Sequence, residues 1–291
     1  MRQATADPGQ REVRLAQGTI RYRDTGSGAP IVFVHGLLVN GLLWRKVVPE
    51  LSSEFRCVVP DWPLGSHAEP MAPEADLSPP GVARLISEFL EALELEEVTL
   101  VGNDTGGALC QLVATRHPQR LARLVLTPCD AYENFLPPLF RPLQWAARVP
   151  GAIYALTQPM RVRALRRLPV GFGLVAKRPI DDVITDAYLA PVLSRRDIRP
   201  DVERFLSGIS TRYTLDAAQR FPDFRKPVLV AWGPEDRVFK LEYAERMAAA
   251  FPQARLERIE DSFTFVPEDQ PRRTAELIAA FVRESASARA A

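Results

Sequence analysis

The segment from Val98 to Gly107 is the feature that most constrains how this chain can fold. Its first four residues form an apolar run typical of a buried strand, and a helical pattern begins directly after Asp104. Gly102 and Gly106 flank Asp104 two residues away on either side. A strand that turns sharply into a helix needs small neighbours there, because its central residue is strained and presents its side chain. The segment therefore predicts a tight strand-to-helix turn that exposes the Asp104 carboxylate at a helix N-terminus, where negative charge is favoured.

Strand-like and helix-like segments alternate along most of the remaining sequence. The strand-like runs, which are mostly apolar, cover residues 31–34, 55–59, 98–101, 121–126 and 227–232, and a weaker sixth run covers residues 255–259. The helical patterns cover residues 79–93, 105–117 and 274–283. Continuous apolar strands that alternate with helices indicate an α/β fold, in which a mostly parallel central sheet carries helices on both faces.

The rhythm changes between residues 128 and 224, where prolines and aromatic residues are frequent and no apolar strand occurs. We expect an inserted helical cap over residues 131–221, with residues 1–130 and 222–291 forming the core domain. The first part of the insertion is basic: residues 131–178 hold eight Lys and Arg against the single acid Glu133. Such a run usually forms a charged face that is solvated or pairs with another helix. A surface that attracts anionic substrates is the less common alternative.

Composition excludes several functional classes. The chain has 37 Lys and Arg against 36 Asp and Glu, which argues against a nucleic-acid partner. Its three histidines and three cysteines lack metal-ligand spacing, and no phosphate-binding or dinucleotide motif occurs, so we expect no metal and no cofactor. Cys57, Cys110 and Cys129 lie in apolar stretches and are expected to be buried free thiols.

Neither a targeting signal nor a membrane span is visible. Residues 1–17 lack the apolar centre of a secretory signal, and no apolar run reaches the roughly 18 residues of a spanning helix. We therefore expect a cytoplasmic protein that acts on a small molecule and contacts no membrane. The sequence leaves the oligomeric state open.

The order of the motifs resembles α/β-hydrolase-fold proteins of the haloalkane dehalogenase and epoxide hydrolase type. The matching elements are His35-Gly36 after a strand, the Asp104 turn, an inserted cap, the segment from Trp232 to Asp236, and the segment from Phe265 to Pro271. The resemblance implies that Asp104 attacks an electrophilic carbon and forms an alkyl ester, which a histidine-activated water then hydrolyses.

The resemblance also implies the surroundings of Asp104. The backbone N–H groups of Leu37 and Thr105 would form the oxyanion hole, which stabilises developing negative charge. A small, mostly apolar substrate would lie in a pocket beside the loop that follows the first central strand. The pocket residues implied in this way are His35, Gly36, Leu38, Asn40, Trp44, Tyr132 and Phe265.

The sequence departs from that family at the catalytic base. Thr264 occupies the histidine position, and no histidine follows His117. A threonine hydroxyl cannot activate water as imidazole does. His67, in a loop after a predicted strand, is a candidate replacement, although a packed or solvated role is more usual for such a residue. His35 is expected to support its loop.

Two further carboxylates are expected near Asp104. Asp236 matches the acid of the family, and Asp130 follows the preceding strand, where some dehalogenases place that acid instead. Three functions stay open. The first is a hydrolase with Asp104 and an unusual base. The second is a lyase, isomerase or cyclase that uses Asp104 and Asp236 as acid and base. The third is an inactive ligand-binding protein with the same fold.

Overall fold

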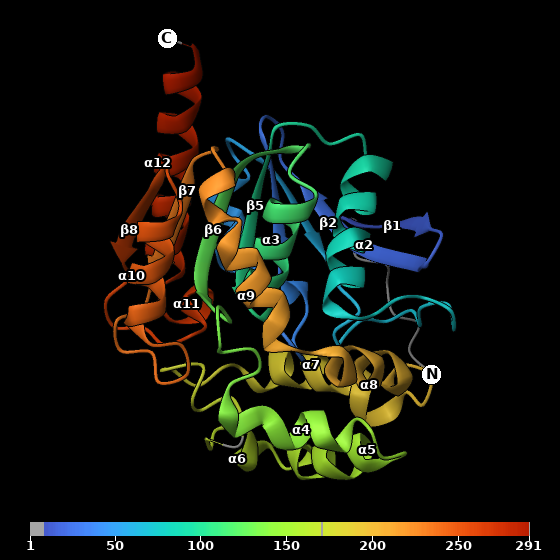
Figure 1. Ribbon diagram of the computed structural model, residues 1–291. Coiled ribbons are helices and arrows are strands. Elements are labelled where there is room, and N and C mark those ends of the chain that lie inside the picture. Colours follow the sequence, from blue (N-terminus) through green and yellow to red (C-terminus); the bar gives the residue numbers. More distant parts are fainter. Residues whose placement is uncertain (1–8, 170, 291) are drawn as a thin grey trace.

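An eight-stranded sheet forms the centre of the protein in the computed structural model, which describes residues 9–169 and 171–290 (Figure 1). The strand order is β1-β2-β4-β3-β5-β6-β7-β8. Strands β1 and β2 pair antiparallel, β2 pairs antiparallel with β4, and all remaining pairs are parallel. The bounds are β1 Gln10–Leu15, β2 Gly18–Thr25, β3 Pro30–Val34, β4 Arg56–Pro60, β5 Val98–Asp104, β6 Leu121–Cys129, β7 Val228–Trp232 and β8 Ala254–Arg258.

The six strands predicted from the sequence are all present, with bounds shifted by one to three residues. The antiparallel pair β1 and β2 was not predicted. Its residues are mostly charged or polar, and in β2 only Ile20 and Tyr22 are buried. A pair at the edge of a sheet buries little apolar surface, so its sequence lacks the pattern by which a central strand is found.

Helices cover both faces of the sheet. Helix α3 (Thr105–Arg116) packs on β5 and β6 with α2 (Pro79–Ala92) and α9 (Thr211–Gln219) beside it, while α10 (Leu241–Ala250) packs on β7 and β8. On the other face, α1 (Val48–Leu51) contacts α12 (Pro271–Ala290), which follows α11 (Val266–Asp269). Helix α2 begins as its sequence predicts: Ser78 caps the first turn by accepting from the N–H of Gly81, and two prolines follow.

The inserted cap lies beyond the carboxyl ends of the parallel strands, at the bottom of Figure 1. Its 3-10 helices are η2 (Pro138–Phe140) and η3 (Gln158–Arg161). Its α-helices are α4 (Arg141–Ala146), α5 (Ala152–Thr157), α6 (Arg163–Arg166), α7 (Asp182–Ser194) and α8 (Arg199–Gly208). Helix α9 falls within the predicted cap limits of 131–221 but lies along α3 of the core, and those limits stay a prediction.

Part of the basic run in the cap forms ion pairs between helices. The buried guanidinium of Arg166 donates to Thr185 at 3.0 Å and to Asp186 at 2.5 Å, and Arg163 donates to the other oxygen of Asp186. Arg167 pairs with Asp182 on the same helix, α7. These contacts hold α6 against α7, as expected of an interhelical charge face.

The junction of α3 with β6 generates a first prediction. A Cβ added to Gly107 would lie 2.3 Å from the Cβ of Cys129, so Gly107→Ala must push the helix and the strand apart. We expect the free energy of unfolding, measured by urea denaturation, to fall by about 1–3 kcal/mol. Gly9→Ala is the matched control because nothing lies within 4 Å of its added Cβ. Equal stability of the two variants would contradict the tight packing.

Candidate active site

Asp104 stands where β5 passes directly into α3. Its backbone has φ 55° and ψ −135°, a conformation that non-glycine residues rarely adopt and that stores strain. The turn also needs glycine nearby. A Cβ on Gly106 would lie 2.4 Å from the carbonyl oxygen of Val34, and one on Gly36 would lie 2.0 Å from Oδ2 of Asp104. These close approaches bring the loop after β3 directly onto the Asp104 carboxylate.

The Asp104 carboxylate accepts hydrogen bonds from the backbone N–H groups of Thr105 and Leu37. Asp104 is half-buried, and the loss of solvent around it raises its pKa to about 7 against the lowering effect of these two donors. The negative charge of Asp236 raises the pKa further. Asp104 is therefore divided between carboxylate and carboxylic acid near neutral pH.

Asp130 and Asp236 lie close enough to interact with Asp104. Oδ2 of Asp130 accepts from the Thr105 hydroxyl at 3.2 Å, and Oδ1 is buried with no hydrogen-bond partner among the described residues. Burial, followed by the charge of Asp104, raises the pKa of Asp130 well above its usual range. Asp104 thus interacts electrostatically with both neighbouring carboxyl groups, and the ionisation of Asp104 is linked to that of Asp130.

Thr264 is held in contact with Asp236. Its buried hydroxyl donates to Oδ1 of Asp236 at 3.1 Å, and that oxygen also accepts from the N–H groups of Val238 and Phe239 at 2.7 and 2.9 Å. Burial raises the pKa of Asp236 to about 7 despite these donors. The carbonyl of Thr264 accepts from the side-chain amide of Asn103, the neighbour of Asp104, at 2.8 Å.

The described histidines are engaged away from Asp104. Nδ1 of His35 donates to the carbonyl of Gly36, and its Nε2 accepts from the N–H of Trp62 at 2.8 Å. Burial lowers the pKa of His35 to about 4, so the ring is neutral and supports its loop. Nε2 of His67 donates to Asp201 on α8 at 2.9 Å, and His67 does not line the cavity at Asp104. His117 ends α3.

An apolar cavity of about 140 Å³ opens onto Asp104 and Thr105. From the core it is lined by Leu37, Leu38 and Phe265, all named from the sequence. Its remaining lining comes from the cap, namely Leu136, Phe140, Leu143, Leu156, Thr157, Met160, Gly171, Phe172, Val175 and Leu189. Sequence reasoning missed these cap residues, because their only signal was an apolar spacing of three to four residues in very short helices. No basic side chain lines the cavity among the described residues.

Of the seven residues predicted to line the pocket, only Leu38 and Phe265 line the cavity. His35 and Gly36 lie in the loop beneath Asp104, and three others contact different parts of the structure. Asn40 caps η1 (Gly41–Trp44) by accepting from the N–H of Leu42 at 3.1 Å. Trp44 is buried against Phe33, with ring centroids 4.8 Å apart. The guanidinium carbon of Arg246 lies over the Tyr132 ring, 3.9 Å from the ring centroid.

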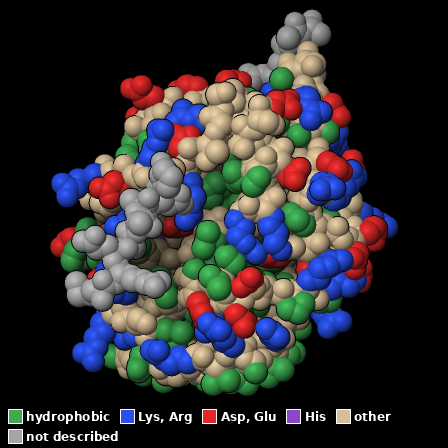
Figure 2. Space-filling view, turned by 180° about the vertical axis from the view of Figure 1, so that it is seen from behind, with side chains coloured by type: hydrophobic (Ala, Val, Ile, Leu, Met, Phe, Trp, Pro, Cys, Tyr) green, Lys and Arg blue, Asp and Glu red, His purple; other side chains and the backbone are tan. Residues whose placement is uncertain are grey.

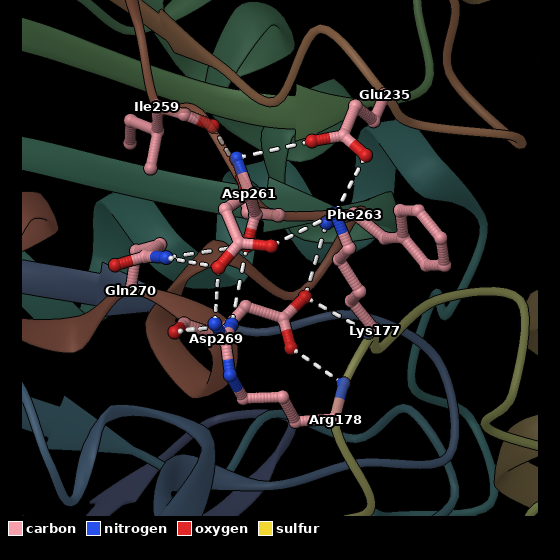
Figure 3. Close-up of polar contacts among 9 residues, drawn as sticks. Lys177, Arg178, Glu235, Ile259, Asp261, Phe263, Asp269 and Gln270 are labelled. Atoms are coloured by element: carbon pink, nitrogen blue, oxygen red, sulfur yellow. Dashed lines mark hydrogen bonds and ion pairs between the residues drawn. The ribbon is translucent and has the colours of Figure 1, made fainter.

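A polar cluster fastens the cap to the loop that carries Thr264 (Figure 3). The Asp269 carboxylate accepts from the backbone N–H groups of Lys177 and Arg178, both at 2.9 Å, and from that of Phe263 at 3.0 Å. The Lys177 ammonium pairs with Glu235 at 2.6 Å and with Asp261 at 2.8 Å. We call this group of residues the Asp269 cluster; it joins the segment at Lys177 and Arg178 to the loop of residues 261–270.

Comparison with known proteins identifies the family. The model of the α/β hydrolase fold family matches residues 29–271. The chain belongs to this family. It is an α/β-hydrolase-fold enzyme related to haloalkane dehalogenases. Among the described residues, no group of three or more His, Cys, Asp or Glu side chains is arranged to hold a metal ion.

Relatives carry several activities. Haloalkane dehalogenase 2 of Mycobacterium tuberculosis is 27% identical over 273 residues, covering 90% of this chain and 91% of that protein. The cis-3-alkyl-4-alkyloxetan-2-one decarboxylase of Shewanella oneidensis is 28% identical over 266 residues, covering 86% of this chain and 80% of that protein. A solved esterase from Thermogutta terrifontis shares the fold with a TM-score of 0.76 and 23% identity, covering 94% of this chain and 99% of that chain.

The raised pKa of Asp236 generates a prediction for stability. An unfolded aspartate ionises near pH 4, whereas Asp236 in the folded protein ionises near pH 7. The folded state therefore binds more protons between these values, and stability falls as pH rises from about 4 to 7. Asp236→Asn removes this loss, so urea denaturation should show a gain over the wild type that grows to roughly 2–4 kcal/mol at pH 8 and is small at pH 4. Exposed Asp216→Asn is the control, and a gain independent of pH would contradict the assignment.

Proposed function

We propose that Asp104 is a nucleophile in a lyase whose covalent ester breaks down without water. The observation that carries the proposal is the pairing of Thr264 with Asp236 at the place where the resemblance expects a histidine. Asp104 lies between two N–H donors and faces an apolar cavity, which suits attack on an electrophilic carbon. With no imidazole nearby, hydrolysis of the resulting ester lacks its base. Complete turnover then needs a substrate whose adduct fragments by itself.

A β-lactone, or oxetan-2-one, meets this requirement. Attack of Asp104 on ring carbon C4 forms a C–O bond and breaks the C4–ring oxygen bond, which leaves a carboxylate on C3. Loss of carbon dioxide then breaks the C3–carboxyl bond, and its electron pair forms the C3=C4 double bond. The C4–O bond to Asp104 breaks at the same time and restores the carboxylate. No proton moves and no water is consumed, so a base is unnecessary.

The surroundings of Asp104 favour both steps. The N–H groups of Leu37 and Thr105 stabilise negative charge on Asp104 as it leaves the adduct. The cavity offers the substrate carboxylate no cation, and an unpaired charge in an apolar site is destabilised. Its conversion to neutral carbon dioxide relieves that cost. The name of the Shewanella relative, a decarboxylase of a dialkyl oxetanone, supports this substrate class. The size of the cavity favours short alkyl groups.

One observation favours a second function, namely hydrolysis of the same ester. Oδ1 of Asp130 is buried without a hydrogen-bond partner among the described residues, and Asp130 reaches Thr105 beside Asp104. In this alternative Asp130 accepts the proton of an attacking water. Two further functions remain, namely acid–base catalysis by Asp104 and Asp236, and ligand binding without turnover. The experiments below distinguish both from the lyase.

The product of a small cis-3,4-dialkyl-oxetan-2-one separates these functions. We expect one alkene and one carbon dioxide for each lactone, measured by gas chromatography, because the adduct fragments without water. Asp104→Asn should lower the rate at least about 10³-fold, since it removes the nucleophile. Asp130→Asn should retain most of the wild-type rate.

A β-hydroxy acid as the product, with activity lost in Asp130→Asn, would instead establish the hydrolase. Activity that survives in Asp104→Asn but not in Asp236→Asn would remove the nucleophile altogether. Unchanged lactone with a tightly bound ligand would indicate a binding protein.

Thr264→His tests the missing base directly. With a small bromoalkane, intact-protein mass spectrometry of the wild type should show a stable adduct on Asp104, because no base hydrolyses the ester. In Thr264→His the imidazole would lie beside Asp236, so the adduct should disappear and the alcohol should accumulate catalytically. Thr264→Val is the matched control, which loses the hydroxyl but gains no base. Multiple turnovers by the wild type, or an adduct that persists in the histidine variant, would contradict the proposal.

A further inference from the structure

The first part of the cap carries an unusual concentration of exposed apolar side chains. Of the nine large hydrophobic residues exposed in the described part of the chain, seven fall between residues 139 and 168. We call these seven the cap patch: Leu139, Trp145, Val149, Tyr154, Leu156, Val162 and Leu168. Trp145 is 63% exposed, whereas Trp44, Trp62 and Trp232 are fully buried. An apolar surface gathered in this way marks an interaction site.

The same segment is strongly basic. Residues 139–168 contain six arginines and no acidic residue. Three of the arginines are neutralised by Asp182 and Asp186 of α7. The others, Arg141, Arg148 and Arg161, are exposed and pair with no acidic side chain among the described residues. Figure 2 shows apolar side chains along the lower rim of the molecule with basic side chains beside them.

A basic hollow of about 670 Å³ adjoins the cap patch. Its lining includes Arg161, Arg196 and Arg199 with Tyr154 of the patch, against the single acid Glu203. The Arg199 guanidinium lies over the Tyr154 ring, 4.1 Å from its centroid. Arginine is suited to phosphate because its N–H groups match the phosphate oxygens. Arg161 and Arg199 also donate to the carbonyls of Leu193 and Val192, so the hollow offers anionic headgroups positive charge and the remaining N–H groups beside the apolar side chains.

We propose that the cap patch docks on the surface of an anionic lipid bilayer. Exposed tryptophan and aliphatic residues beside unpaired arginines are the composition of an interfacial membrane surface. Self-association through the patch would bring two positively charged faces together, so charge favours a lipid surface over a second copy. No helix among the described residues is long and apolar enough to cross a membrane, and the contact is therefore peripheral. No membrane contact was expected from the sequence, because no spanning segment is visible in it. Peripheral docking needs no such segment.

Docking would also place the cavity at the lipid surface. Leu156 belongs to the cap patch and lines the cavity at Asp104 as well. If the proposed function holds, an apolar substrate dissolved in the bilayer can reach the cavity past Leu156 without crossing water. This consequence depends on the proposed function, whereas docking itself does not.

Vesicle binding of the full-length protein tests the proposal. We expect co-sedimentation with vesicles of phosphatidylcholine containing about one-third phosphatidylglycerol, at least tenfold weaker binding to phosphatidylcholine alone, and release by 0.5 M salt. Binding should shift the fluorescence of Trp145 to shorter wavelength, because it is the exposed tryptophan. Trp145→Phe should remove this shift and keep binding. Arg141→Glu with Arg148→Glu should weaken binding at least tenfold.

The matched controls lie outside the cap patch. Val183→Ser with Leu215→Ser replaces two exposed apolar residues, and Arg258→Glu with Arg272→Glu reverses two exposed charges elsewhere. Both pairs should bind as the wild type does. Equal binding by Arg141→Glu/Arg148→Glu and wild type, no binding to anionic vesicles at low salt, or a dimer that Trp145→Ser/Val149→Ser dissociates would each overturn the proposal. The assay involves no turnover, so failure of the lactone chemistry leaves its result unaffected.

Discussion

The structure depends on a half-buried carboxylate that two backbone N–H groups bind at the end of a strand. Asp104 can occupy its strained turn only because Gly36 and Gly106 let three backbone segments meet there. The hydrogen bonds from Leu37 and Thr105 then offset part of the cost of burying its charge. Strand β3, the loop after it and the start of α3 must all be in place for this arrangement. The central sheet is thus organised around the Asp104 turn.

The neighbouring carboxyl groups set the chemistry that the turn can support. Asp130 and Asp236 are buried, and loss of solvent is the main cause of their raised pKa values; the charge of Asp104 adds to the shift of Asp130. In a site with an imidazole, the ring can take a proton from water, and its positive charge then compensates the negative charge of the carboxylates. A site that pairs Asp236 with a hydroxyl cannot do so. This arrangement supports the proposed reaction, in which charge moves through the substrate and returns to Asp104.

Prediction from sequence succeeded where the local backbone or burial requires a particular type of residue. The glycines around Asp104 and the apolar runs of the central strands belong to this group, and so does the cap on α2 at Ser78. It failed where the outcome depends on distant partners. Nothing local indicates that His67 contacts Asp201, that Trp44 packs on Phe33, or that the edge strand β1 forms. The roles proposed for Asp104, Asp130 and Asp236 remain predictions, because function depends on a substrate that the sequence does not name.

The Asp269 cluster bears on how such proteins diversify. Cap exchange is an obvious route to new specificity, since the cap is inserted between two strands of a shared core. In this chain the backbone of Lys177 and Arg178 is bound by a carboxylate that lies more than 90 positions later in the sequence. A cap from another protein would lack a backbone segment positioned to donate to Asp269. Transfer of this cap to another core should therefore succeed best when residues 261–270 are transferred with it.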